Sequence, residues 1–397
     1  MRSAALVSAL VICGALVTPA AAQTAADGDW ILDARLRYEA VAQDGFADAD
    51  ALTFRARLGY ETPVWRGWRA LGEIEGVVHL NDDFNDTVNG NARFAVVADP
   101  EALEVNRLQL SWTEEEGRRL VAGRQRIVLN NARFLGNVGF RQNEQTFDAL
   151  RLETRAAANA TLTYIYLDGV HRIFGDDSAQ GEWTSDSHVA QIDLDLPVGR
   201  LGGYALLLDF NNAPAQSSQT YGVRWSHEWE AGAFRPRVTL EAAAQSDYRG
   251  NTAGFDLGYQ HAELALRRGQ WSATFGGERL EGDNARGFST PLATLHAFQG
   301  WADIFLATPP DGVRDLYAGV SFSTRPWLAD RPVVLSLVAH DFTDDGGGGD
   351  FGSEFDASAR FALNERVSLE LKAAAFEGED PRFADRDKFW FALEYRF

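Results

Sequence analysis

Arginine recurs at every second position in several stretches of the first half of the chain. Arg35 and Arg37 form one such pair, and Arg55 and Arg57 form another. A guanidinium group donates two parallel hydrogen bonds to a carboxylate or phosphate and keeps its charge at physiological pH. Such side chains, gathered on one surface, would attract an anionic solute. The arginines that the sequence predicts for this surface are Arg35, Arg37, Arg55, Arg57, Arg107, Arg124, Arg126 and Arg151.

Motifs for catalysis or metal binding are sparse by comparison. The seven histidines form no HExxH or other compact ligand spacing, and the Gly-x-Ser-x-Gly motif of α/β-hydrolases is absent. His340-Asp341 and the scattered serines leave open a catalytic pair assembled from distant strands. The glycine run 346–349, flanked by Asp344 and Asp350, could bind Ca²⁺, although a solvated loop is the simpler interpretation. We expect no enzymatic activity, no cofactor and no metal.

The charge balance excludes a further class of partner. The chain has 57 acidic and 37 basic residues among 397, a formal net charge of −20. A nucleic-acid-binding protein would be basic, so no nucleic-acid partner is expected. Cys13 is the only cysteine, and it lies in the apolar N-terminal stretch of residues 4–17. A chain without that stretch has no disulfide and no thiol nucleophile.

The N-terminus has the pattern of a signal peptide. Arg2 supplies a positive start, residues 4–17 form an apolar run, and Pro19–Ala22 offers small residues for cleavage before Gln23. A helix needs about 20 apolar residues to span a bilayer, and this run is shorter. The sequence therefore predicts a cleaved signal peptide over residues 1–22 and one domain over residues 23–397.

That domain reads as a succession of β-strands. Apolar and polar residues alternate through most of it, as in residues 32–39 and 389–397, and alternation places the two kinds on opposite faces of a strand. We count about eighteen such stretches by this criterion, the eighth beginning near His188. The region 167–174 fits the pattern poorly. At Gln260-His261 the apolar parity switches, which predicts a β-bulge.

The connections between the stretches alternate in length. Those after even-numbered strands are mostly tight turns, whereas many after odd-numbered strands are long and polar. The long ones are residues 81–100, 130–145, 175–187, 282–313 and 343–352. Short turns at one end and long loops at the other are typical of bacterial outer-membrane barrels. The predicted fold class is therefore an all-β, transmembrane antiparallel β-barrel of about eighteen strands, with short periplasmic turns and long extracellular loops.

The last residue supports a membrane barrel. Phe397 ends a run of alternating aromatic residues, which resembles the C-terminal signature of outer-membrane proteins. With the apolar parity facing lipid, the alternating arginines face the lumen together with Glu73, Glu75 and Glu153. Two interpretations remain open. The arginines either guide an anionic solute, or they pair with these carboxylates and merely neutralise a wide polar lumen.

Three segments carry a resemblance to a known family. They are Gly123–Asp148, Phe288–Asp303, and His340-Asp341-Phe342 with Gly352–Asp356. Together they resemble the alginate export family of outer-membrane porins. The resemblance implies an eighteen-stranded barrel whose arginine-rich constriction passes an anionic polysaccharide. It also adds Arg133 and Arg141, which lie in the first segment with Arg124 and Arg126, to the residues implied in the constriction or in a loop folded into it.

The function predicted from these features is an outer-membrane channel for diffusion or export of anionic solutes, including an anionic polysaccharide such as alginate. Acidic loop residues such as Asp82, Asp83 and Asp86 would weaken attraction for a polyuronate, so the resemblance favours a channel more than it favours alginate. The alternatives are a structural or adhesive barrel with a plugged lumen and, last, a barrel-borne enzyme. Expected partners are outer-membrane lipid and lipopolysaccharide, the barrel assembly machinery through Phe397, and an anionic sugar or small anionic solute.

Overall fold

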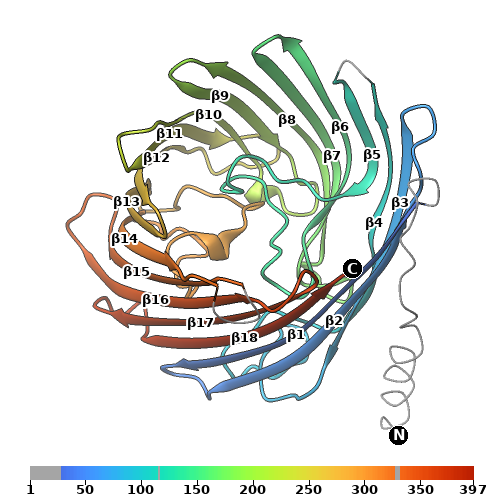
Figure 1. The fold of residues 1–397 in the computed structure, drawn as a ribbon. Coiled ribbons are helices and arrows are strands. Elements are labelled where there is room, and N and C mark those ends of the chain that lie inside the picture. The colour runs from blue at the N-terminus through green and yellow to red at the C-terminus, as the bar shows by residue number, and fades with distance from the viewer. Residues whose placement is uncertain (1–27, 115–116, 327–330) are drawn as a thin grey trace, which may run out of the picture.

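The strands form one closed antiparallel barrel. The computed structural model describes residues 28–114, 117–326 and 331–397, so the predicted signal peptide lies outside the described residues. Eighteen strands follow one another around a single sheet, and the first pairs with the last to close it (Figure 1). The predicted fold class is confirmed. Among the described residues, no helix is long and apolar enough to cross a membrane.

The strand bounds follow the alternating stretches of the sequence. The strands are β1 Asp29–Gln43, β2 Ala49–Glu61, β3 Trp68–His79, β4 Ala102–Thr113, β5 Arg119–Gln125, β6 Thr146–Ala157, β7 Ala160–His171, β8 Glu182–Leu196, β9 Gly199–Leu208, β10 Ser218–Glu228, β11 Arg235–Asp247, β12 Asp256–Arg268, β13 Trp271–Leu280, β14 Val313–Ser323, β15 Val333–Thr343, β16 Asp350–Ala362, β17 Val367–Gly378 and β18 Arg386–Arg396. Two short 3₁₀ helices, Pro214–Gln216 and Leu295–Ala297, lie in loops. The eighth strand begins at Glu182, earlier than the predicted start near His188.

The outer face of the barrel carries an apolar band. Leu103, Leu108 and Phe355 are 81%, 63% and 67% exposed, although each lies within a strand. Aromatic pairs such as Trp68–Trp112 and Trp271–Phe322 lie at the short-turn ends of their strands. An apolar band bordered by aromatic residues is what a barrel surface needs in a bilayer.

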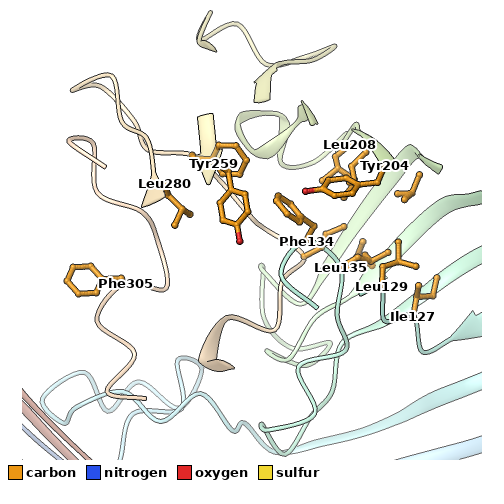
Figure 2. Close-up of a cluster of buried hydrophobic side chains, with 14 of the residues drawn as sticks. Ile127, Leu129, Phe134, Leu135, Tyr204, Leu208, Tyr259, Leu280 and Phe305 are labelled. Carbon is orange, nitrogen blue, oxygen red and sulfur yellow. The ribbon is translucent and has the colours of Figure 1, made fainter. Parts of the chain in front are cut away.

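Two long loops fold into the barrel. Residues 126–145, here the first inward loop, and residues 281–312, the second inward loop, both lie inside the ring of strands (Figure 1). Phe134 and Leu135 of the first pack with Phe305 of the second in one buried apolar cluster. Figure 2 shows Tyr204 and Tyr259 reaching this cluster from the wall. The lumen therefore contains an apolar core in addition to polar surface.

The predicted bulge in β12 is wrong, and this core explains the switch in apolar parity that suggested it. The strand pairs without a register shift through Gln260 and His261 with both neighbours. Leu257 and Tyr259 are buried because they face the inward loops, whereas Leu264 is 37% exposed on the outer face. The apolar parity switches because a different apolar surface covers each half of the strand, and the strand itself stays regular. In the poorly fitting region 167–174, strand β7 continues to His171 with a register shift between Leu167 and Gly169.

Candidate functional site

The arginines of β1 and β2 point into the lumen and are buried there. Arg35, Arg37, Arg55 and Arg57 are at most 8% exposed. Alternation alone predicts their direction, because residues two apart on a strand share a face. The first inward loop lies against this wall, where Phe140 covers Arg37 and Gln142 contacts Arg35.

Their partners are carboxylates and loop carbonyls. Arg35 donates hydrogen bonds to the carbonyl of Gly139, at 3.0 Å, and to the side chain of Gln142, also at 3.0 Å. Arg37 forms salt bridges with Glu39, at 2.5 Å, and with Asp99. The guanidinium groups of β1 thus anchor two extracellular loops to the wall.

The arginines of β2 pair mainly across the sheet. Arg55 forms salt bridges with Asp33 of β1 and, at 3.4 Å, with Glu394 of β18. Arg57 forms a salt bridge with Glu75 of β3. For these two residues the interpretation as charge neutralisation fits the observed contacts, and their role toward a solute stays a prediction.

A second group of charges surrounds Glu144, the penultimate residue of the first inward loop. Arg126 Nη2 lies 2.5 Å from Glu144, and Arg107 Nη2 lies 2.6 Å from Glu73. Asn106, which projects at a register shift between β3 and β4, donates to both Glu73 and Glu144. Burial raises the pKa of Glu144, but Arg57 and Arg126 together lower it by more, so its pKa is about 2. Glu144 therefore stays ionised and holds the end of the loop to the wall.

Arg124 does not face the lumen, and this part of the prediction is wrong. In the register it lies opposite Leu108 and Asp148, and paired residues of an antiparallel sheet share a face. Leu108 is strongly exposed on the outer face, so Arg124 is on the outer face as well. It binds Asp148 at 3.0 Å and donates to the carbonyl of Val105 at 3.0 Å. Because the chain leaves the wall after Gln125, Arg124 and Arg126 do not continue one strand face.

The remaining predicted arginines are separated from one another. Arg133 is buried among the inward loops, where its Nε lies 2.7 Å from Glu278 of β13. Arg141 joins Glu39 of β1 and Asp303 of the second inward loop, each at 3.2 Å. Arg151 faces the lumen from β6 and pairs with Glu153 at 3.0 Å. The ten predicted arginines thus do not form one continuous surface.

A buried cluster of charged side chains surrounds His296, and the sequence does not predict it. His296 Nδ1 lies 2.8 Å from Asp303, and His296 Nε2 lies 2.7 Å from Lys372 Nζ. Asp303 also accepts a hydrogen bond from Lys388 at 2.7 Å. Burial lowers the pKa of His296, Asp303 raises it and Lys372 lowers it, so its pKa is about 3. Alternation marks Lys372 and Lys388 only as lumen-facing, and no sequence signal connects them with a loop histidine far away in the chain.

The catalytic and calcium interpretations gain no supporting geometry. His340 Nδ1 lies 3.0 Å from Asp315, and its Nε2 lies 3.7 Å from Asp356, so both nitrogens face carboxylates. Asp341 is opposite Leu316, which is exposed on the outer face. The Asp344 carboxylate accepts the N–H groups of Gly348 and Gly349. In the part of the chain that the structure describes, no group of three or more His, Cys, Asp or Glu side chains is arranged to hold a metal ion.

A polar cavity lies beside the inward loops. This cavity, here called the chamber, has a volume of about 700 Å³ and is lined by strands β10 to β17 and by the second inward loop. Its charged residues include Arg224, Arg237 and Glu263, and serines such as Ser336 and Ser358 line it as well. Arginines outside the predicted set therefore contribute to this chamber.

Solved structures share this architecture. OccAB4 from Acinetobacter baumannii superposes with a TM-score of 0.74 at 13% identity, over 95% of this chain and 99% of that one. OpdL from Pseudomonas aeruginosa gives 0.68 at 17% identity, over 94% and 99%. OpdK from the same organism, in a structure with vanillate, gives 0.68 at 13% identity, over 93% and 98%.

The other comparisons add no family. No protein-family model matches the chain, and no curated protein matches it. The resemblance to the alginate export family is therefore unsupported by any of these comparisons and stays a prediction. What the structural likeness shows is that the chain has the fold of an outer-membrane porin.

Proposed function

We propose that the protein is an outer-membrane channel through which small water-soluble solutes diffuse. The observation that carries this proposal is the polar chamber of about 700 Å³ inside a closed barrel. The apolar outer band supports a location in a bilayer, where all strand edges must be paired. The bacterial outer membrane is the proposed location because the fold is that of outer-membrane porins.

A small solute fits this lumen better than a polymer. The two inward loops fill much of the extracellular half with a buried apolar core, and several salt bridges fix them to the wall. A polysaccharide would have to displace these contacts along its whole path. Export of alginate is therefore the weaker form of the channel proposal.

An anionic solute is the proposed preference. The arginines that keep exposed guanidinium groups inside the barrel support it: the side chains of Arg126, Arg151 and Arg237 are 32%, 23% and 50% exposed. A carboxylate passing them would exchange part of its hydration for hydrogen bonds. The OpdK structure with vanillate gives a precedent for a carboxylate in a barrel of this fold.

The second candidate function is a barrel whose lumen is plugged. The apolar core formed by Phe134, Leu135 and Phe305 inside the lumen favours it. Purified, correctly folded protein in a planar bilayer separates the two functions. Discrete current steps are expected for a channel. Heat-dependent gel mobility shows whether the barrel is folded. If the folded barrel inserts and conducts no current, the channel proposal is overturned in favour of the plug.

A further inference from the structure

Lys372 occupies an unusual position on the inner wall. It lies on β17, directly opposite Ser358 of β16 and Trp390 of β18, and it is 7% exposed. Among the described residues it has no carboxylate within salt-bridge distance, although the neighbouring lumen-facing lysine, Lys388, has two. A buried ammonium group without a carboxylate in direct contact must replace its hydration in another way.

Aromatic rings and one histidine replace that hydration. The Nζ atom of Lys372 lies 3.9 Å from the ring centre of Trp301, 4.6 Å from that of Phe140 and 5.3 Å from that of Trp390. Its hydrogen-bond partner is His296 Nε2, at 2.7 Å. Each ring offers the negative face of its π-system to the cation.

These partners come from both inward loops. Phe140 belongs to the first, His296 and Trp301 belong to the second, and Trp390 belongs to the wall. Phe140 also stacks on His296, with ring centres 3.5 Å apart and planes 12° apart. One wall side chain therefore touches both loops at the point where they meet each other.

The proton on His296 makes the contact directional. His296 Nδ1 faces the Asp303 carboxylate at 2.8 Å, so this nitrogen carries the proton and donates it. His296 Nε2 then has a free lone pair, and it accepts the N–H of Lys372. Lys372 keeps this hydrogen bond only while the second inward loop holds His296 beside it.

We propose that Lys372 is a positioning residue that holds both inward loops against β17 and β18 and thereby sets the width of the aqueous path. The inference rests on the proposed channel function. It follows from geometry because Lys372 and Trp301 both line the chamber. Loss of the cation releases Phe140 and His296 together, and the loops then move relative to the wall.

Lys372→Met tests this, because methionine keeps an unbranched apolar chain among the rings but has no charge and no donor. We expect a changed single-channel conductance with several levels where the parent has one. Lys372→Arg, which keeps a cation among the rings, should restore most of the parent behaviour. Arg360→Met is the matched control: Arg360 lines the same chamber, and its salt bridge, at 2.6 Å, is with Glu370 of the neighbouring strand. It removes the same charge and should leave one conductance level.

A distance measurement tests loop position without relying on conduction. Cys13 is the only cysteine, so in a Cys13→Ser background spin labels at Ala297→Cys, in the second inward loop, and at Ser358→Cys, on β16, report one distance across the chamber. The distribution should broaden in Lys372→Met and stay narrow in Arg360→Met. An unchanged distribution and conductance in Lys372→Met would overturn the inference. A parent protein without current would overturn the channel function instead, and the distance measurement would still decide the role of Lys372.

A second substitution covers failure of the first to fold. Trp301→Leu removes the ring closest to the cation and leaves Lys372 in place. The spin-label distribution should broaden in this variant too, to a smaller extent. If the distribution stayed as narrow as in the parent, the aromatic contact would have no positioning effect and the inference would fail.

Discussion

Arg141 and Asp303 join the two inward loops by a salt bridge of 3.2 Å. Each also binds the wall, Arg141 through Glu39 at 3.2 Å and Asp303 through Lys388 at 2.7 Å. The backbone of Asp303 is held at a φ of 60°, a conformation that a non-glycine residue adopts at a cost. The loops and the β1–β18 seam therefore behave as one unit, and the ion pairs hold a strained segment in place.

Asp303→Asn should destabilise this unit strongly. The substitution leaves the buried Arg141 and Lys388 with Glu39 as their one shared carboxylate, and breaking a buried ion pair costs about 3–5 kcal/mol. We expect a lower midpoint of urea unfolding in detergent. Asp387→Asn, at an exposed position next to Lys388 in the chain, is the control and should unfold like the parent. Equal midpoints for the two variants would show that the loops do not depend on Asp303.

The barrel could be predicted from the sequence because the alternation of apolar and polar residues is visible within each single strand. Arg35 and Arg37 face the lumen for a reason visible in their spacing alone. The contacts of the inward loops are different, because they depend on residues far apart in the chain. His296 and Lys372 are hydrogen-bonded although they are 76 residues apart in the chain. The sequence around either residue gives no indication of this contact.

Arg124 shows where alternation itself gives a wrong answer. Its even-numbered neighbours Leu120 and Ala122 share its face, and β5 ends one residue after it. A short strand with apolar residues on both faces does not identify its inner side. Only pairing with Leu108 does so, and pairing is not readable from one strand.

Acid should release the end of the first inward loop. Glu144 has a pKa of about 2 in the folded protein, below the value of about 4.3 for a free glutamate. A lowered folded-state pKa means that its stabilising effect is complete above the unfolded-state value and is lost as the pH falls toward about 2. Unfolding midpoints should therefore decrease between about pH 5 and pH 2. Glu144→Gln should be less stable at neutral pH and should lose part of this pH dependence. The same slope in both proteins would contradict the assignment.

Phe397 should matter for assembly. Its backbone N–H donates to the carbonyl of Leu32 at 2.8 Å, beyond the last paired residue of β18, and the Arg366 guanidinium lies 4.4 Å from its ring centre. Phe397→Ala keeps the backbone bond but removes the terminal ring that the assembly machinery is proposed to bind. We expect less protein in the outer membrane at unchanged synthesis, measured by immunoblot of membrane and whole-cell fractions. Arg396→Ala, at a side chain that is 69% exposed, should accumulate normally.

Ion selectivity should respond to Arg126 and not to Arg124. Arg126 lies in the first inward loop beside Glu144, and its side chain is 32% exposed. Arg124 is on the outer face and is neutralised by Asp148. Arg126→Gln frees a negative charge inside the barrel, so the reversal potential in a salt gradient should move toward cation preference. Arg124→Gln changes charge outside the solute path and should leave the reversal potential unchanged.

Salt dependence completes this test. The Debye length falls from about 10 Å at 0.1 M to about 3 Å at 1 M salt, so the shift caused by Arg126→Gln should shrink as the ionic strength rises. If the shift in reversal potential persisted at 1 M salt, its cause would be a displaced loop and not a changed electrostatic field in the lumen. No shift at low salt would mean that Arg126 serves only to hold Glu144. The pairing interpretation of the lumen arginines would then extend to the most exposed arginine of that loop.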